Sequence, residues 1–267
     1  DDSLFTGPAV NPHWEDDYIS DDVTTPVSAL WVDEGVSADT GRRSRRPARD
    51  ATDAFAHALE KRGVTVRGKT RRDTHAQNET VARVRSAPLE QIVQSLLERS
   101  DNDAAEVVLR HAAIAAGEPA SFAGGVDAVR QTLTAMGIPW QGNKMFDGSG
   151  LARGDKVTLA SLLGVLQQAA ARDETGGLLD DLPVAGFSGS LAGRFTGPGT
   201  DPGLGVVRAK TGTLSGVHSL AGVTVDADGT VLAFVLMTDK VRLPDTLDAR
   251  ATLDRVAATL TACACGR

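Results

Sequence analysis

A β-strand is predicted for Leu204-Gly-Val-Val-Arg-Ala-Lys-Thr-Gly-Thr213. Two further strands are expected after it, at Gly216-Val-His-Ser-Leu-Ala-Gly-Val-Thr-Val225 and at Val231-Leu-Ala-Phe-Val-Leu-Met237, separated by the turn residues Asp226-Ala-Asp-Gly229. Strands this close in sequence predict an antiparallel meander. Lys210 lies on its first strand.

A helix is predicted well before the meander. It opens at Ser86-Ala-Pro-Leu-Glu90, with a capping Ser and an early Pro, and is expected to end at Arg99. Its apolar side chains recur at helical spacing. They are Leu89, Ile92, Val93, Leu96 and Leu97.

Ser100-Asp101-Asn102 is expected to join that helix to a second one, and both helices would then hold the tripeptide beside a shared cleft. The expected inner side of the second helix is Ala104, Val107, Val108 and Ala112. A closing helix is predicted from Leu243 to Ala262. Its expected inner side is Leu247, Ala251, Leu253, Val256, Ala257 and Leu260. These elements predict an α/β chain of the α+β layered kind, with an antiparallel sheet flanked by helices.

Two short motifs carry the chemistry. Ser100-Asp101-Asn102 and Lys210-Thr211-Gly212-Thr213 match two of the three motifs of the penicillin-recognising serine acyl-transferases. Each is weak alone, because the tripeptide is also a common helix cap or turn and the second is also an ordinary strand end. The third motif, Ser-x-x-Lys, is missing, since no serine in the sequence has a lysine three residues on.

Longer runs of sequence make the resemblance more specific. The chain is similar to the D-alanyl-D-alanine carboxypeptidase/endopeptidases of the penicillin-binding protein 4 type, and the matching runs follow the family's order over nearly the whole chain. Besides the two motifs, they are Asp2-Ser-Leu-Phe-Thr-Gly-Pro8, Pro26-Val-Ser-Ala-Leu-Trp-Val-Asp-Glu-Gly35, Ala54-Phe-Ala-His-Ala-Leu-Glu-Lys-Arg-Gly-Val-Thr-Val66, Asp147-Gly-Ser-Gly-Leu-Ala-Arg-Gly154 and Leu182-Pro-Val-Ala-Gly186.

The resemblance implies a β-lactamase/transpeptidase-like fold and a serine-type hydrolase of peptidoglycan. The expected substrate is a stem peptide ending in D-Ala-D-Ala, cleaved through an acyl-enzyme, and β-lactam antibiotics are expected to bind because they mimic that end. The expected location is extracytoplasmic, in the cell envelope or secreted. No cofactor or metal is implied.

Three residues match the family's catalytic positions. Ser100 has a hydroxyl that both accepts and donates, which suits a proton path to the leaving amine. Lys210 supplies a positive charge that can hold Ser100 and attract the substrate's terminal carboxylate. The amide of Asn102 can orient both the substrate and the missing lysine.

Four further residues match substrate-binding positions. Thr211 and Thr213 offer hydroxyls to the substrate carboxylate, and the backbone N–H of Thr213 can face the oxyanion. Gly212 leaves room for close approach, which a side chain would block. Ser215 is a weaker candidate for the same carboxylate.

The nucleophile and its lysine match no residue here, so the chain alone is expected to be unable to acylate. The sequence begins at Asp1 without Met or an apolar leader, and we expect it to be the later part of a longer protein, with the N-terminal strand and nucleophile helix missing. An upstream segment of that protein is therefore an expected partner. Residues 1–50 are interpreted as the remnant of an inserted region, and residues 51–267 as the transpeptidase-like domain.

Composition excludes some other functions. The net charge of −7 and the pI near 5.3 argue against a nucleic-acid surface, and no apolar run is long enough to span a bilayer. Cys263 and Cys265 are interpreted as incidental, and the five histidines show no ligand spacing. The arginine run Gly41–Arg49 is interpreted as a solvated loop.

Two alternatives remain open. A serine β-lactamase shares the motifs, although the matches from Asp2 to Val66 count against it. A non-catalytic wall-binding or regulatory protein that has lost its nucleophile would also fit, although intact motifs argue against long-standing decay.

Overall fold

The computed structural model describes residues 1–37, 40–74 and 80–265. By their contacts they form two compact units that alternate along the sequence. Unit 1 comprises Asp1–Arg85, Asn102–Thr132 and Lys144–Asp155; unit 2 comprises Ser86–Asp101, Leu133–Asn143 and Lys156–Arg267. The division into residues 1–50 and 51–267 stays a prediction.

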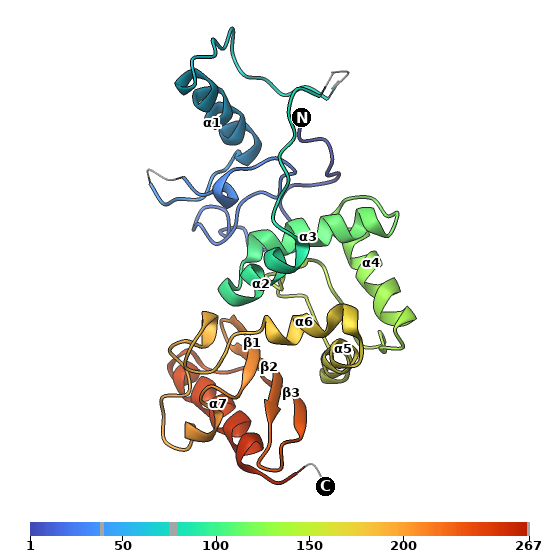
Figure 1. Ribbon diagram of the computed structural model, residues 1–267, viewed down its shortest axis with the longest axis vertical. Helices are drawn as coiled ribbons and strands as arrows, with labels where there is room; N and C mark the ends of the chain where they lie inside the picture. Colours follow the sequence, from blue (N-terminus) through green and yellow to red (C-terminus); the bar gives the residue numbers. More distant parts are fainter. Residues whose placement is uncertain (38–39, 75–79, 266–267) are drawn as a thin grey trace. The chain divides into compact units, whose positions relative to one another are not determined.

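Unit 2 contains the expected meander, a three-stranded antiparallel sheet in the order β1-β2-β3 (Figure 1). The strands are β1 (Arg208–Leu214), β2 (Val217–Val225) and β3 (Val231–Thr238). The first strand begins later than predicted, because Leu204 and Val206 lie exposed in a turn. The fold class, helices with an antiparallel sheet, is confirmed.

The core of unit 2 lies between the sheet and the closing helix α7 (Thr246–Ala262), which follows a 3₁₀ turn at Leu243–Asp245. Leu220 and Phe234 of the sheet are buried with Leu253, Ala257 and Ala258 of α7. Two alanines in succession let the helix approach the strands closely.

The predicted inner side of the closing helix is partly wrong. Leu247 is 72% exposed and Val256 is 40% exposed, whereas Leu253 and Ala257 are buried. The packed stripe is narrower than the sequence pattern, because alanines occupy the centre of the contact and the larger side chains at its edges remain in solvent.

Three more helices belong to unit 2: α2 (Leu89–Arg99), α5 (Leu159–Ala171) and α6 (Asp173–Asp180). Helix α2 ends at Arg99 as predicted, but Pro88 and not Ser86 precedes its first turn, and no side chain caps it. None of the expected apolar residues of α2 is fully buried, and Leu89 is 65% exposed. Thr158 caps α5 by accepting a hydrogen bond from the N–H of Ser161.

Unit 1 contains α1 (Pro47–Lys61), α3 (Asn102–Ala115) and most of α4 (Phe122–Ala135). Most of the remainder is irregular backbone that folds back on α3. The predicted inner side of α3 is wrong, because its small apolar residues are only half buried. The buried residues are Asp103, Glu106, Leu109, Arg110 and Ala113.

Cys263 and Cys265 are bonded to each other as a disulfide, so their interpretation as incidental was wrong. Their Cα atoms lie 5.3 Å apart, within the usual range for a disulfide. None of the described helices combines the length and apolar character needed to cross a membrane.

Candidate active site

Ser100 ends helix α2 in a backbone conformation that residues other than glycine seldom adopt. Its φ of 55° and ψ of 51° are left-handed, and its own N–H donates to the carbonyl oxygen of Leu96. A non-glycine residue in this region costs roughly 1 kcal/mol or more, and such residues concentrate at turns and functional sites. The chain therefore turns sharply at Ser100, which redirects its side chain away from the helical path.

Lys210 on β1 meets this serine. Its Nζ donates hydrogen bonds to Ser100 Oγ at 2.6 Å and to the carbonyl oxygen of Thr211 at 2.7 Å. Both motif residues lie within unit 2, so one compact body fixes their distance. The contact expected between the two motifs is present, while their catalytic roles stay predictions.

The surroundings of Lys210 change its acidity. Desolvation by burial lowers the pKa of Lys210 to about 8. At neutral pH most molecules still carry the ammonium, but a measurable fraction holds the neutral amine. A lysine in this condition can donate a proton and take one back, and its hydrogen bond to Ser100 gives that proton a path through the hydroxyl.

The other residues of the Lys210 motif lie on both faces of β1. Side chains alternate along a strand, so Lys210 and Gly212 share one face and Thr211 and Thr213 the other. Thr213 is exposed, and Ser215 is exposed just beyond the strand. Their binding roles stay predictions.

Gly212 has a clear steric reason to be glycine. It pairs with Ser219 of β2, and a Cβ at position 212 would lie 2.3 Å from Ser219 Oγ. The close approach seen here is that of the neighbouring strand, and the role of Gly212 in admitting the substrate stays a prediction.

A short 3₁₀ turn, Gly189–Leu191, contacts both motif-bearing elements and was not anticipated as part of the site. Gly189 has a φ of 51°, and a Cβ on it would lie 2.4 Å from the carbonyl oxygen of Glu98, two residues before Ser100. Ser190 Oγ accepts a hydrogen bond of 2.8 Å from Thr211 Oγ1, one residue after Lys210. Leu191 is fully buried in the core.

This turn holds the end of α2 and the start of β1 at a set separation. Its Gly between two serines, Ser188-Gly189-Ser190, is the only sequence signal, and such a pattern is typical of any turn. Sequence reasoning therefore had no means of placing it beside Lys210.

Asn102, the third predicted catalytic residue, is the first residue of α3 and belongs to unit 1. Its side chain is half buried. Its role stays a prediction.

The run Asp147–Arg153, part of one of the stretches that match the family, forms a loop around two buried carboxylates of unit 1. Asp147 accepts hydrogen bonds from the N–H groups of Gly150 and Ala152 and from Trp14 Nε1, at 2.7 to 2.8 Å. Glu106 of α3 accepts from the N–H of Gly148 and of Ser149. The loop is thus folded by backbone donors around these acids.

Comparison with known proteins identifies the relatives of this chain. The model of the D-Ala-D-Ala carboxypeptidase 3 (S13) family matches residues 34–260. Carboxypeptidase DacB of Mycolicibacterium smegmatis is 37% identical over 276 residues, an alignment that covers 100% of this chain and 58% of that relative. The chain thus spans little more than half of that relative's length.

Two crystal structures of penicillin-binding protein 4 from Haemophilus influenzae have the same fold. One has a TM-score of 0.76 at 23% identity and covers 96% of this chain and 74% of that one. The other, complexed with a β-lactam, has a TM-score of 0.69 at 30% identity and covers 80% of this chain and 52% of that one. The resemblance inferred from the motifs is confirmed, and the chain belongs to the D-Ala-D-Ala carboxypeptidase 3 (S13) family.

Proposed function

We propose that this chain is part of a serine-type DD-carboxypeptidase/endopeptidase that cleaves peptidoglycan stem peptides ending in D-Ala-D-Ala. The observation that carries the proposal is the 2.6 Å hydrogen bond between Lys210 and Ser100, which unites two family motifs in one compact unit. Family membership and the relative named as a carboxypeptidase support the same reaction.

In the proposed reaction a serine oxygen attacks the carbonyl carbon of the penultimate D-Ala. The bond to the terminal D-Ala breaks, its nitrogen takes a proton, and an acyl-enzyme remains that water then hydrolyses. We assign to Ser100 the transfer of that proton to the leaving nitrogen. We assign to Lys210 its replacement, which is supported by the hydrogen bond between the two residues and by a lowered Lys210 pKa that allows proton exchange near neutral pH. The cationic form of Lys210 would also attract the substrate's terminal carboxylate.

The remaining predicted residues complete the substrate site. We assign Asn102 to the substrate amide, and Thr211, Thr213 and Ser215 to the carboxylate, with the N–H of Thr213 at the oxyanion. Gly212 keeps the strand free of a side chain at this point. The attacking serine and its lysine are proposed to lie in a Ser-x-x-Lys segment outside these 267 residues, because no serine of the sequence fits that motif.

The proposed reaction also implies where the protein works. Its substrate lies outside the cytoplasmic membrane, so we propose an extracytoplasmic location, in the cell envelope or secreted. β-Lactams are proposed ligands, since one structural relative was solved in complex with one.

The test compares three proteins in a labelling assay with fluorescent penicillin and in a D-Ala release assay. They are the full-length protein, its Lys210→Ala variant and the 267-residue chain by itself. The full-length protein should be labelled and release D-Ala, whereas the 267-residue chain should show no covalent label. A boil-stable adduct on that chain would show that the nucleophile lies within it.

Lys210→Ala removes a charge-assisted hydrogen bond, a loss of about 1.5 to 3 kcal/mol, or one to two decades in acylation rate. Lys61→Ala, on the exposed last turn of α1, is the matched control and should leave acylation unchanged. A full-length protein that binds penicillin without acylation or D-Ala release would instead be the non-catalytic binding protein considered above.

A further inference from the structure

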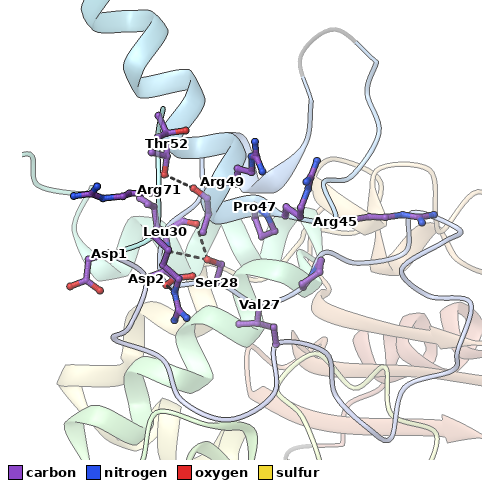
Figure 2. A pocket seen from close by; sticks show the side chains of 16 residues that line it. Asp1, Asp2, Val27, Ser28, Leu30, Arg45, Pro47, Arg49, Thr52 and Arg71 are labelled. Carbon is purple, nitrogen blue, oxygen red and sulfur yellow. Dashed lines mark hydrogen bonds and ion pairs between the residues drawn. The ribbon is translucent and has the colours of Figure 1, made fainter. Parts of the chain in front are cut away.

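A cavity of about 450 Å³ lies in unit 1, lined by residues that precede both motifs in the sequence. It is formed by the first residues of the chain, the segment Pro26–Leu30, the start of α1 and residues 70–72 (Figure 2). Its volume falls in the range typical of small-molecule sites. All of the residues that line it belong to unit 1, so the cavity is a feature of one compact body.

Arginine dominates the rim of this cavity. Five arginines line it, against two acids, in a chain whose net charge is −7. All five side chains are exposed at the rim. They are Arg45, Arg46, Arg49, Arg71 and Arg72. A concentration of one charge in an acidic protein produces a local positive field that attracts anions.

Most of this charge is not neutralised by the residues that the structure describes. Arg72 pairs with Asp2, and Arg49 lies 3.6 Å from Asp53 on the next turn of α1. Arg45, Arg46 and Arg71 form no ion pair in the part of the chain that the structure describes. Three guanidinium groups are therefore available to a ligand.

The floor of the cavity is apolar and already ordered. Val27 and Pro47 are buried there, and Leu30 and Ala48 are half buried. Ser28 Oγ donates to the carbonyl oxygen of Leu30 at 2.8 Å and so fixes the turn beneath the rim. A concave apolar floor with charged groups at its edge is the usual build of a binding site, and differs from a loop of solvated arginines.

The Asp2–Arg72 pair is an ion pair within the chain that already joins one rim arginine to a carboxylate. Asp2 is a half-buried carboxylate, and its partner comes from seventy residues later in the chain. A carboxylate satisfies one guanidinium as a two-point ligand, whereas the oxygens of a phosphate can bridge two. Arg45 and Arg46 are adjacent in sequence and both line the cavity.

We propose that this arginine-lined cavity binds an extended ligand that carries two or more phosphate groups. Figure 2 shows Arg71 and Arg45 at opposite sides of the cavity, which favours a ligand with several anionic groups over a single compact anion. A chain of phosphates across the cavity reaches both sides. This ligand is separate from the proposed peptide substrate, and the inference does not rest on the proposed function.

The test measures binding of a fluorescent short-chain polyphosphate to the full-length protein by anisotropy, with inorganic phosphate and poly-glutamate as competitors. The site variant replaces Arg45, Arg46 and Arg71 together by glutamine, which keeps part of the side-chain stem. The control variant replaces three exposed arginines of the same unit that do not line the cavity, Arg62, Arg83 and Arg85, also by glutamine. Both variants change the net charge by the same amount.

We expect the site variant to bind polyphosphate at least about tenfold more weakly, since two or more charge-assisted hydrogen bonds are lost, and the control variant to stay within about twofold. Inorganic phosphate should compete only at far higher concentration than polyphosphate if the ligand must span the cavity. The single variants Arg45→Gln and Arg71→Gln, each expected to show a partial loss, serve if the triple variant does not fold.

Three outcomes would overturn the proposal. One is no measurable binding of polyphosphate by the parent. Another is an equal loss in the site and control variants, which would show attraction to overall charge. The third is competition by poly-glutamate as strong as by polyphosphate, which would show that the cavity does not select phosphate.

Discussion

The two units of this chain are stabilised in opposite ways. Unit 2 encloses an apolar core between its sheet and α7, in which Leu220, Phe234 and Ala257 are almost completely buried. Unit 1 has a smaller apolar interior and wraps irregular backbone around ionisable side chains of α3. Asp103, Glu106 and Arg110 of that helix are almost completely buried.

The two kinds of interior suit different structural requirements. The unit 2 contact between Ser100 and Lys210 needs a fixed distance, and a core of strands and a helix supplies it. In unit 1 a carboxylate holds several backbone donors at once, so loops without regular structure still keep a defined shape. The stability of unit 1 should consequently depend on charge, and that of unit 2 on packing.

The largest expected effect is on Asp103. Its Oδ1 accepts hydrogen bonds from Thr24 Oγ1 at 2.7 Å and from the N–H of Thr25 at 2.7 Å, and Oδ2 pairs with Arg43. Asp103→Ala leaves these partners unsatisfied inside the protein, which should lower the free energy of unfolding by about 3 to 5 kcal/mol. Urea unfolding would measure the loss.

The matched control for this change is Asp127→Ala. Asp127 pairs with Arg130 on the exposed surface of α4, and its loss should cost at most about 1 kcal/mol. Equal losses in the two variants would contradict the view that unit 1 depends on its buried acids. Amide exchange in α3 would show that the damage is in unit 1.

Sequence reasoning succeeded for the strands of unit 2 because their apolar pattern follows directly from local strand and turn formation. Short strands around the turn Asp226–Gly229 predict a meander, and β2 and β3 lie within two residues of their expected positions. The ends of α2 and α7 were also correct, at Arg99 and Ala262. Local propensity and tertiary packing agree in these elements.

It failed in unit 1 because burial there does not follow hydrophobicity. The expected inner residues of α3, Val107 and Val108 among them, are half buried, while Glu106 and Arg110 are enclosed. The guanidinium of Arg110 donates hydrogen bonds to the carbonyl oxygens of Thr6, Pro8 and Ala120. Hydrophobic periodicity in the sequence cannot reveal such partners.

The candidate site was predicted in part. The motifs indicated Ser100 and Lys210, and the structure brings these two together. The turn at Gly189 and Ser190 was missed, because its role depends on which elements lie beside it in space and not on its own composition.

The next prediction tests whether unit 2 depends on the packing of its apolar core. Leu220 is fully buried beneath α7, so Leu220→Ala should lower the free energy of unfolding by about 2 to 5 kcal/mol through lost contacts and a new cavity. Because the deleted atoms are apolar, the loss should be the same at pH 5 and pH 8. Chemical unfolding at both values is the measurement.

Leu247→Ala is its control, and it also tests the corrected face of α7. This side chain is 72% exposed, so the change should stay within about 0.5 kcal/mol. If Leu247→Ala lowered the free energy of unfolding as much as Leu220→Ala, Leu247 would belong to the packed face of α7, as the sequence predicted.

A smaller effect concerns activity and not stability. In Gly189→Ala the new methyl group would press on the carbonyl oxygen of Glu98 and move Ser100 away from Lys210. β-Lactam acylation by the full-length protein should fall by about one to two decades, the loss of one charge-assisted hydrogen bond. Stopped-flow acylation kinetics would measure it.

Gly193→Ala is the control, since no atom outside its neighbours lies within 4 Å of the added Cβ. The pH profile separates positioning from general damage. If Lys210 loses its enclosure, its pKa rises toward that of an ordinary lysine, and the profile should shift to higher pH in Gly189→Ala alone. A reduced rate with an unshifted profile would mean that the turn has only a structural role.

The last effect is graded with pH, is small for any single step of one pH unit, and belongs to unit 1. Burial, and then the charge of Asp147, raise the pKa of Glu106 to about 7 and that of Asp155 to about 8. Hydrogen bonds from Ser149 and from the N–H of Gly148 oppose part of the rise at Glu106, while desolvation lowers the pKa of Arg110, one turn along α3. Folded unit 1 thus holds protons that an unfolded chain releases near pH 4.

Because the folded state binds more protons than the unfolded state, stability is greatest below about pH 4 to 5 as far as these groups are concerned, and falls as pH rises toward 7 to 8. The expected slope is about 1 kcal/mol per pH unit for each proton held. Glu106→Gln mimics the protonated acid and should remove its share of the slope, whereas Glu60→Gln, at an exposed position of the same unit, should not. Urea unfolding from pH 5 to 8 would measure the slope, and amide exchange in α3 and in β2 would show which unit loses stability. A free energy of unfolding that does not change with pH, or a loss of protection confined to β2, would contradict the assignment of charge dependence to unit 1.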